Sequence, residues 1–221
     1  MNTFLDRREA GRMLASRLGA YANRSDVVVL AVPRGGVPVA YEVARALTAP
    51  LDVFLVRKVY APGRDDIQVA TIATGDFEVL ETSTIETRGV DRRVVEHEMG
   101  AARRDLAAQE RTYRGSRPLA DLTGRTVILV YDGIVTGGSM VASVAALRAR
   151  GAARVIVASP VAPPNAVASV TQVADGCVCV MTVEPFYRIG IWYDDFAPVS
   201  DASVLMFLDC AARTLGDAAA A

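Results

Sequence analysis

An apolar strand that leads through a loop of small residues into a helix is the feature that most constrains this chain. The run 126–130 is apolar and β-branched, a loop that contains Asp132 follows it, and an Ala-rich helical stretch begins near Met140. Backbone N–H groups at a helix N-terminus attract anions, and glycines such as Gly137 and Gly138 let the backbone approach a ligand closely. The segment therefore predicts a phosphate-binding loop, with Asp132 placed to accept hydrogen bonds from sugar hydroxyls.

Strands of the same buried kind recur along the chain. Continuous apolar runs alternate with stretches of helical period, and these runs cover residues 27–32, 51–56, 126–130, 155–161 and 176–183. Such alternation is typical of an α/β fold in which helices cover both faces of a parallel sheet. We therefore expect a doubly wound, five-stranded parallel sheet in a single domain over 1–221. Its core should span about 10–183 and a small C-terminal hood about 184–214.

The remaining stretches have less regular patterns. Residues 60–75 are rich in Pro, Gly, Asp and Arg and have no clear period, which predicts a long mobile loop that includes a strand at 69–73. A short strand pair is expected over 77–87. Helices are expected over 4–22, 37–47, 91–113, 140–150, 163–174 and 203–214.

Composition excludes several classes of function. The net charge is −1, so the chain as a whole is not suited to nucleic acid or to an anionic membrane. No apolar run reaches the roughly 18 residues that span a bilayer, and residues 1–12 lack an apolar signal core. We interpret the three cysteines as small buried side chains, and the one histidine, His97, as a solvated residue of the charged helix. A zinc site needs about four ligands, so the chain is not expected to hold one. We therefore expect a cytoplasmic protein with a small phosphorylated ligand.

The loop after residue 130 resembles the motif that binds 5-phosphoribosyl 1-pyrophosphate (PRPP) in type I phosphoribosyltransferases. There an apolar strand leads into two acidic residues and a small-residue loop that ends T-G-x-[ST], as residues 136–139 do here. The likeness extends to a bacterial subgroup of uncharacterised members through residues 4–7, 33–40, 51–53, 56–58, 61–63, 160–164 and 184–186. One departure is Tyr131, which stands where the family usually has a carboxylate.

This resemblance implies a set of ligand-binding positions. The expected PRPP-binding residues are Arg34, Gly35, Gly36, Tyr131, Asp132, Gly133, Ile134, Val135, Thr136, Gly137, Gly138 and Ser139. The turn of Arg34, Gly35 and Gly36 suits a pyrophosphate, because a guanidinium and exposed backbone N–H groups both bind phosphate oxygens. The family also implies Mg²⁺, which would bridge pyrophosphate and ribose hydroxyls with Asp132 as the metal-binding residue. We expect a homodimer.

Arg57 and Lys58 resemble the basic pair that precedes the mobile catalytic loop in several members of the family. With Asp132 they are the expected catalytic residues, and Lys58 would neutralise the departing pyrophosphate. Lys58 is the single lysine among 24 basic residues. The alternative is that Lys58 is an ordinary basic residue on the surface, with no catalytic role.

The acceptor is expected in the hood. Phe186, Tyr187 and Asp194 are candidates to bind a small-molecule base, whereas Trp192 and Phe196 are expected to form the hood core or a dimer contact. The predicted function is transfer of phosphoribose from PRPP to a nitrogenous acceptor, with release of pyrophosphate. The alternative is a sensor that binds PRPP or a nucleoside monophosphate without turnover, which Tyr131 favours. A phosphohydrolase lacks the paired carboxylates or histidine cluster that it would need.

Overall fold

The computed structural model describes residues 3–115, 117–135 and 138–220. Side chains are described throughout these ranges except at 138–139 and 216–220. The chain divides into two compact units. Unit 1 comprises Met1–Phe54 and Ala120–Ala221, and unit 2 comprises Leu55–Leu119. Each unit is described by itself below.

Unit 1 contains a five-stranded parallel sheet in the order β2-β1-β6-β7-β8. The strands are β1 (Val27–Ala31), β2 (Leu51–Val53), β6 (Thr126–Val130), β7 (Arg154–Ala162) and β8 (Gly176–Thr182). All residues of β1 and β6 are buried, because helices cover both faces of the sheet. The predicted five-stranded α/β fold is confirmed.

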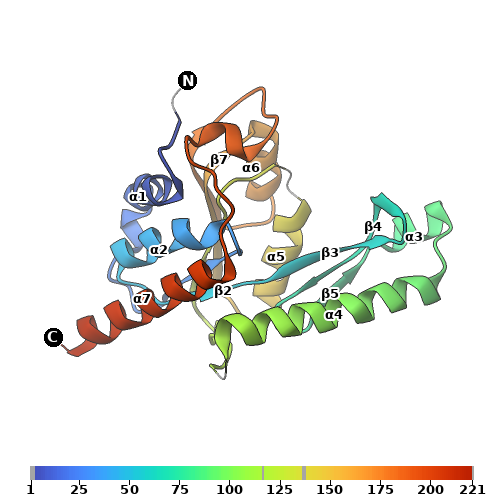
Figure 1. Ribbon diagram of the computed structural model, residues 1–221, viewed down its shortest axis with the longest axis horizontal. Helices are drawn as coiled ribbons and strands as arrows, with labels where there is room; N and C mark the ends of the chain where they lie inside the picture. The colour runs from blue at the N-terminus through green and yellow to red at the C-terminus, as the bar shows by residue number, and fades with distance from the viewer. Residues whose placement is uncertain (1–2, 116, 136–137, 221) are drawn as a thin grey trace. The chain divides into compact units, whose positions relative to one another are not determined.

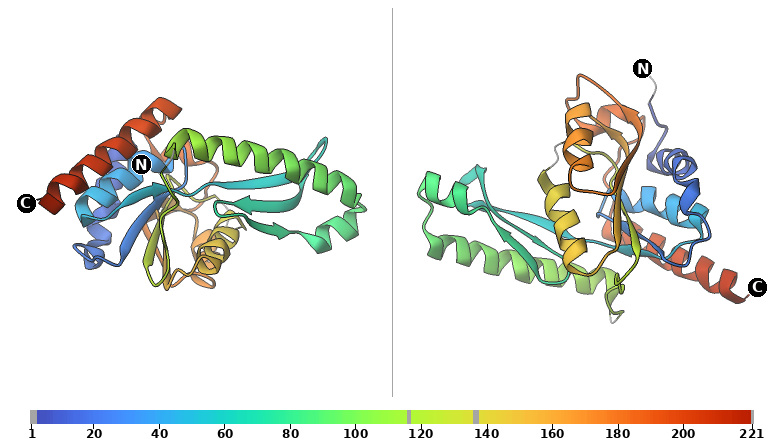
Figure 2. Two further views of the ribbon diagram at one scale, coloured as in Figure 1. Left: turned by 90° about the horizontal axis from the view of Figure 1, so that it is seen from below. Right: turned by 180° about the vertical axis from the view of Figure 1, so that it is seen from behind.

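Helices lie on both faces of this sheet (Figures 1 and 2). On one face are α1 (Arg7–Arg17) and α2 (Gly36–Leu47), and on the other are α5 (Gly138–Ala149) and α6 (Pro164–Thr171). Helix α7 (Asp201–Ala220) packs against α2 and β2. Two short 3₁₀ helices, η1 (Gly19–Tyr21) and η2 (Ile189–Trp192), complete the unit. None of the helices in the described ranges is long and apolar enough to cross a membrane.

Unit 2 is a three-stranded antiparallel sheet in the order β3-β4-β5, with a long helix packed on it (Figure 2). Its elements are β3 (Val56–Ala61), β4 (Arg64–Ala73), β5 (Phe77–Leu80), α3 (Thr82–Arg88) and α4 (Arg92–Arg114). Helix α4 contacts β3 and β4 through a buried stripe that includes Val95, Met99 and Leu106.

Three sequence predictions were wrong here. Residues 60–75, expected to be a loop that includes a strand at 69–73, form most of the β3–β4 hairpin. The expected strand is the second half of β4, which begins at Arg64, and Gly63 has a φ of +68° at the turn. The alternation was hidden because a register shift at Tyr60 interrupts the pairing and β4 begins with three exposed polar residues. Of the strand pair expected over 77–87, only β5 is a strand, and helix α3 follows it.

The third error concerns the strand expected over 51–56. The parallel strand β2 ends at Val53, and Val56 already begins β3 of the other unit. Arg57 and Lys58 therefore lie inside an antiparallel strand rather than beyond the carboxyl end of a parallel one. The helix expected over 4–22 is shorter: α1 begins after Asp6, whose carboxylate accepts a hydrogen bond from the N–H of Glu9 at 2.7 Å.

Candidate functional site

Two of the predicted motifs meet at the carboxyl ends of β1 and β6. Ala31 and Val130 are register partners, so the residues that follow them leave the sheet side by side. The contact is close: a Cβ atom on Gly35 would lie 1.9 Å from Oδ2 of Asp132, and one on Gly36 would lie 2.7 Å from the carbonyl oxygen of Val130. Only glycine fits at these two positions. The structure thus places the Arg34–Gly36 turn directly against Asp132.

The Asp132 carboxylate is paired with an arginine that the sequence analysis did not include among the site residues. Nε of Arg7 donates to Oδ2 of Asp132 at 3.0 Å, and the two side chains are 11% and 19% exposed. Burial raises the pKa of Asp132, and the charge of Arg7 partly offsets that rise. The available signal for Arg7 was its place in the family-like stretch 4–7.

The segment after β8 closes around this ion pair. Nη1 of Arg7 donates to the carbonyl oxygen of Ala197 at 2.9 Å, and its guanidinium carbon lies 3.8 Å from the ring centroid of Phe196. The hydroxyl of Tyr193 donates to the carbonyl oxygen of Asp132 at 2.5 Å. Burial and the neighbouring charge of Asp132 raise the pKa of Tyr193. Asp132 is therefore fixed at both its carboxylate and its backbone.

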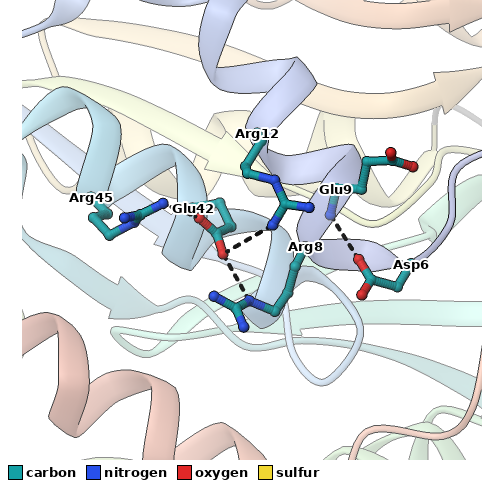
Figure 3. A network of polar contacts seen from close by, with 6 residues as sticks. All are labelled: Asp6, Arg8, Glu9, Arg12, Glu42 and Arg45. Atoms are coloured by element: carbon teal, nitrogen blue, oxygen red, sulfur yellow. Dashed lines mark hydrogen bonds and ion pairs between the residues drawn. The ribbon is translucent and has the colours of Figure 1, made fainter.

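A buried carboxylate fixes α1 on α2 (Figure 3). Glu42 has a fully buried side chain that accepts from Nε of Arg8 at 2.7 Å and from Nη2 of Arg45 at 2.8 Å. Arg12 approaches it to 3.7 Å. Arg7 and Gly36 are the first residues of α1 and α2, so this network holds both of them at the same edge of the sheet.

Tyr131 directly follows β6, but its side chain is buried in the core of unit 1. It is 9% exposed, and its hydroxyl lies 3.1 Å from Oγ of Ser143 on α5. Burial raises its pKa. Tyr131 was predicted among the ligand-binding positions, but its hydroxyl is directed to Ser143 of α5.

The rest of the loop after β6 is described as far as Val135. Ile134 is buried and its N–H donates to the carbonyl oxygen of Val161 at 2.9 Å, while Gly133 packs against Ile189. Val135 is 46% exposed. The predicted binding residues Thr136 and Gly137 lie outside the described residues. Helix α5 begins at Gly138 and Ser139, as the strand–loop–helix prediction requires.

Next to this loop, the hood carries a hollow of about 580 Å³. Its lining consists of Val135, Tyr187, Arg188, Ile189, Gly190 and Phe196. Of the predicted acceptor residues, Tyr187 lies in this lining and is 77% exposed. Phe186 instead stacks on Trp192 at 6.5 Å, and Asp194 accepts a hydrogen bond from Thr3 at 2.6 Å. Trp192 and Phe196 both pack on the buried cluster around Phe4, as expected for hood core residues.

The other basic residues predicted for the site, Arg34, Arg57 and Lys58, lie in different environments. Arg34 is half exposed and lies 3.7 Å from Asp201 at the start of α7. In unit 2, Arg57 donates to Gln109 at 3.2 Å and faces Asp105. Arg57 and Lys58 line a hollow of about 300 Å³ with residues of the β3–β4 turn and α4.

The magnesium site predicted from the sequence has one protein ligand, Asp132. No group of three or more His, Cys, Asp or Glu side chains among the residues that the structure describes could hold a metal ion. Asp132, the predicted metal-binding residue, is paired with Arg7. Magnesium sites commonly combine one or two carboxylates with oxygens of a phosphorylated ligand and water.

Comparisons with known proteins agree with this architecture. The chain is 38% identical over 220 residues to "Putative phosphoribosyl transferase Rv0571c" of Mycobacterium tuberculosis H37Rv and to its counterpart in strain CDC 1551. These matches cover 100% of this chain but 49% of the relatives, so the chain spans about half their length. The crystal structure of TT1426 from Thermus thermophilus is similar with a TM-score of 0.80 and 40% identity, over 93% of this chain and 97% of that one.

The sequence profile that matches the chain covers most of the elements described above. It is the profile of the phosphoribosyl transferase domain, and it matches residues 4–186, from just before α1 to the start of the hood. The matched range includes the Arg34–Gly36 turn, Asp132 and the loop that leads into α5. The chain therefore belongs to the phosphoribosyltransferase domain family.

Proposed function

We propose that this chain transfers phosphoribose from PRPP to a nitrogenous acceptor and releases pyrophosphate. The observation that carries the proposal is the contact between Gly35 and the Asp132 carboxylate. It supports a site in which the turn binds pyrophosphate and Asp132 accepts from the ribose hydroxyls. The N-terminus of α5, eight residues after the end of β6, supplies backbone N–H groups for the 5′-phosphate. Together these groups would bind the pyrophosphate, the ribose hydroxyls and the 5′-phosphate of PRPP.

The reaction follows from these positions. The bond between the anomeric carbon and the pyrophosphate oxygen breaks, and the electron pair leaves with pyrophosphate. The lone pair of the acceptor nitrogen forms the new C–N bond, and the nitrogen loses its proton to solvent or to the leaving group. The transition state resembles an oxocarbenium ion, so positioning and stabilisation of the leaving charge dominate catalysis. We propose that Asp132 orients the ribose and that Arg34 binds the pyrophosphate. Mg²⁺, where the reaction uses it, would be bound by the ligand's own oxygens.

The hollow in the hood suits the acceptor. Tyr187, which is 77% exposed, offers an aromatic ring in its lining, and Val135 joins it to the phosphate loop. Such a lining favours a planar heterocycle that stacks on a ring. We propose a small-molecule base as the second substrate.

A second candidate function is supported by Tyr131 and Arg7. The strand end has one carboxylate where the family usually has two, and Arg7 neutralises that one. A site of this kind could bind PRPP or a nucleoside monophosphate as a sensor without turnover.

Pyrophosphate release, measured with PRPP and a panel of purine, pyrimidine and other nitrogen heterocycles, separates the two functions. An enzyme releases pyrophosphate in step with consumption of one base, and Asp132→Asn lowers that rate. A sensor binds PRPP without base-dependent release. Arg17→Met, which alters an arginine of α1 whose Nη1 donates to the carbonyl oxygen of Cys179, is the matched control.

A further inference from the structure

A pair of reactive side chains lies on β8, apart from the candidate site. Cys177 and Cys179 are free cysteines, and both are half-buried where the sequence analysis expected buried side chains. We propose that their two sulfurs form a binding site for a soft metal ion that prefers thiolate ligands and needs few of them, namely Cu(I). The inference does not depend on the proposed function.

The first step is the placement of the two cysteines. Successive side chains of a strand point to opposite faces, so Cys177 and Cys179 project from the same face of β8. Strand β8 is the last in the order of the parallel sheet, and it pairs with β7, where Val157 and Ser159 are the register partners of the two cysteines. Their position on an edge strand keeps both thiols accessible from one side.

The second step is the spacing of the two residues. On an extended strand, Cα atoms two residues apart are separated by roughly 6.6 Å. This is near the upper end of the range of about 4.4–6.8 Å that a disulfide spans, so a direct bond between the sulfurs is disfavoured. A bridging ion adds two metal–sulfur bonds, each about 2.3 Å long in the case of zinc, and therefore tolerates the wider spacing.

The third step is the interaction between the two thiols. A hydrogen bond with the Cys179 thiol lowers the pKa of Cys177. The same hydrogen bond, together with burial, raises the pKa of Cys179. Cys177 therefore forms a thiolate beside a thiol, and an ion that binds both sulfurs displaces the second proton to solvent.

The number of donors selects the class of ion. Structural zinc sites take four ligands, and the described part of the chain contains no group of three or more His, Cys, Asp or Glu side chains that could hold a metal ion. Met181 is the next residue on the face of the two cysteines, but it packs on the buried cluster around Phe4. Two thiolates suit Cu(I), which soft sulfur ligands select.

The test is competition for Cu(I) between the reduced protein and the chromogenic chelator bicinchoninate, without oxygen. For the wild type we expect one Cu(I) per chain. Cys177→Ser and Cys179→Ser should each weaken binding by roughly a hundredfold or more, because a single thiolate cannot chelate the ion. Cys210→Ser, which alters the half-buried free cysteine of α7, is the matched control and should leave the affinity unchanged.

Alkylation with iodoacetamide, followed by peptide mass spectrometry, gives a second readout on the wild type alone. One equivalent of Cu(I) should protect Cys177 and Cys179 while Cys210 stays reactive. Wild-type binding no tighter than that of Cys177→Ser would overturn the inference, as would an equal loss of affinity in Cys210→Ser or equal protection of all three cysteines. The alkylation result decides the point even if a serine variant does not fold, and none of these outcomes bears on the binding of PRPP.

Discussion

At the scale of single residues, Gly35 connects the two halves of the candidate site. Its backbone has φ −61° and ψ −34°, a conformation open to any residue, so its glycine is not explained by backbone geometry. The explanation is space, because the Asp132 carboxylate occupies the position of a Cβ atom. Any larger residue must displace the group that we propose to hold the sugar.

Gly35→Ala should therefore weaken binding of PRPP or ribose 5-phosphate at least tenfold, since the methyl group displaces the Asp132 carboxylate. Overpacking of this kind typically costs about 1–3 kcal/mol of stability as well. Calorimetry and urea unfolding measure the two effects. Gly19→Ala is the matched control, because a Cβ there meets nothing within 4 Å. Equal ligand affinities for both variants and the wild type would argue against the Asp132 site.

Tyr131 gives a second test at this scale. Because its hydroxyl is buried beside Ser143, Tyr131→Phe should lower the free energy of unfolding by about 0.5–1.5 kcal/mol. Tyr131→Asp introduces the family's usual carboxylate into a core position, and it should cost roughly 3 kcal/mol or more. Chemical denaturation of both variants checks the order. If Tyr131→Asp proves as stable as Tyr131→Phe, residue 131 reaches solvent and could serve the ligand.

At the scale of elements, the degree of burial of a strand determined whether it could be recognised from the sequence. Strands β1, β6 and β7 are covered on both faces, so they are continuous apolar runs that stand out in the chain. The β3–β4 hairpin has polar residues on one side and a register shift, so its period was not visible. The loop and the turn at Gly35 were predicted because they follow such apolar strands. Arg7 was missed because its partner Asp132 lies 125 residues away.

Strand β3 contains Arg57 and Lys58, for which the resemblance to the family's basic pair suggests a catalytic role. If Lys58 neutralises the leaving pyrophosphate, Lys58→Ala should lower turnover by roughly 30- to 1000-fold, the loss of about 2–4 kcal/mol that one electrostatic donor supplies. PRPP affinity should change much less, because that charge is needed most as the bond breaks. Steady-state kinetics separate the two effects. Arg88→Ala, an exposed base at the end of α3, is the control. Turnover by Lys58→Ala at the wild-type rate would remove Lys58 from the mechanism.

At the scale of the whole molecule, the candidate residues are divided between the two compact units. The turn of Arg34, Gly35 and Gly36, Asp132 and the hood hollow belong to unit 1, while Arg57 and Lys58 belong to unit 2. This division separates the residues proposed to bind the ligand from the lysine proposed to act on its leaving group. Ligand binding and turnover should therefore respond to different substitutions.

Thermal unfolding of the intact chain measures ligand binding through the shift in Tm. A ligand that binds only the folded state at 100 times its dissociation constant stabilises that state by about 2.7 kcal/mol, which for a chain of this size raises Tm by roughly 5–10 °C. We expect that shift with PRPP for the wild type and for Lys58→Ala. Asp132→Asn should reduce it, because the hydroxyl acceptor loses its charge and Arg7 loses its partner. No shift with PRPP, ribose 5-phosphate or any nucleoside monophosphate would contradict both the transferase and the sensor. A shift that Lys58→Ala abolishes and Asp132→Asn leaves intact would instead place the ligand on unit 2.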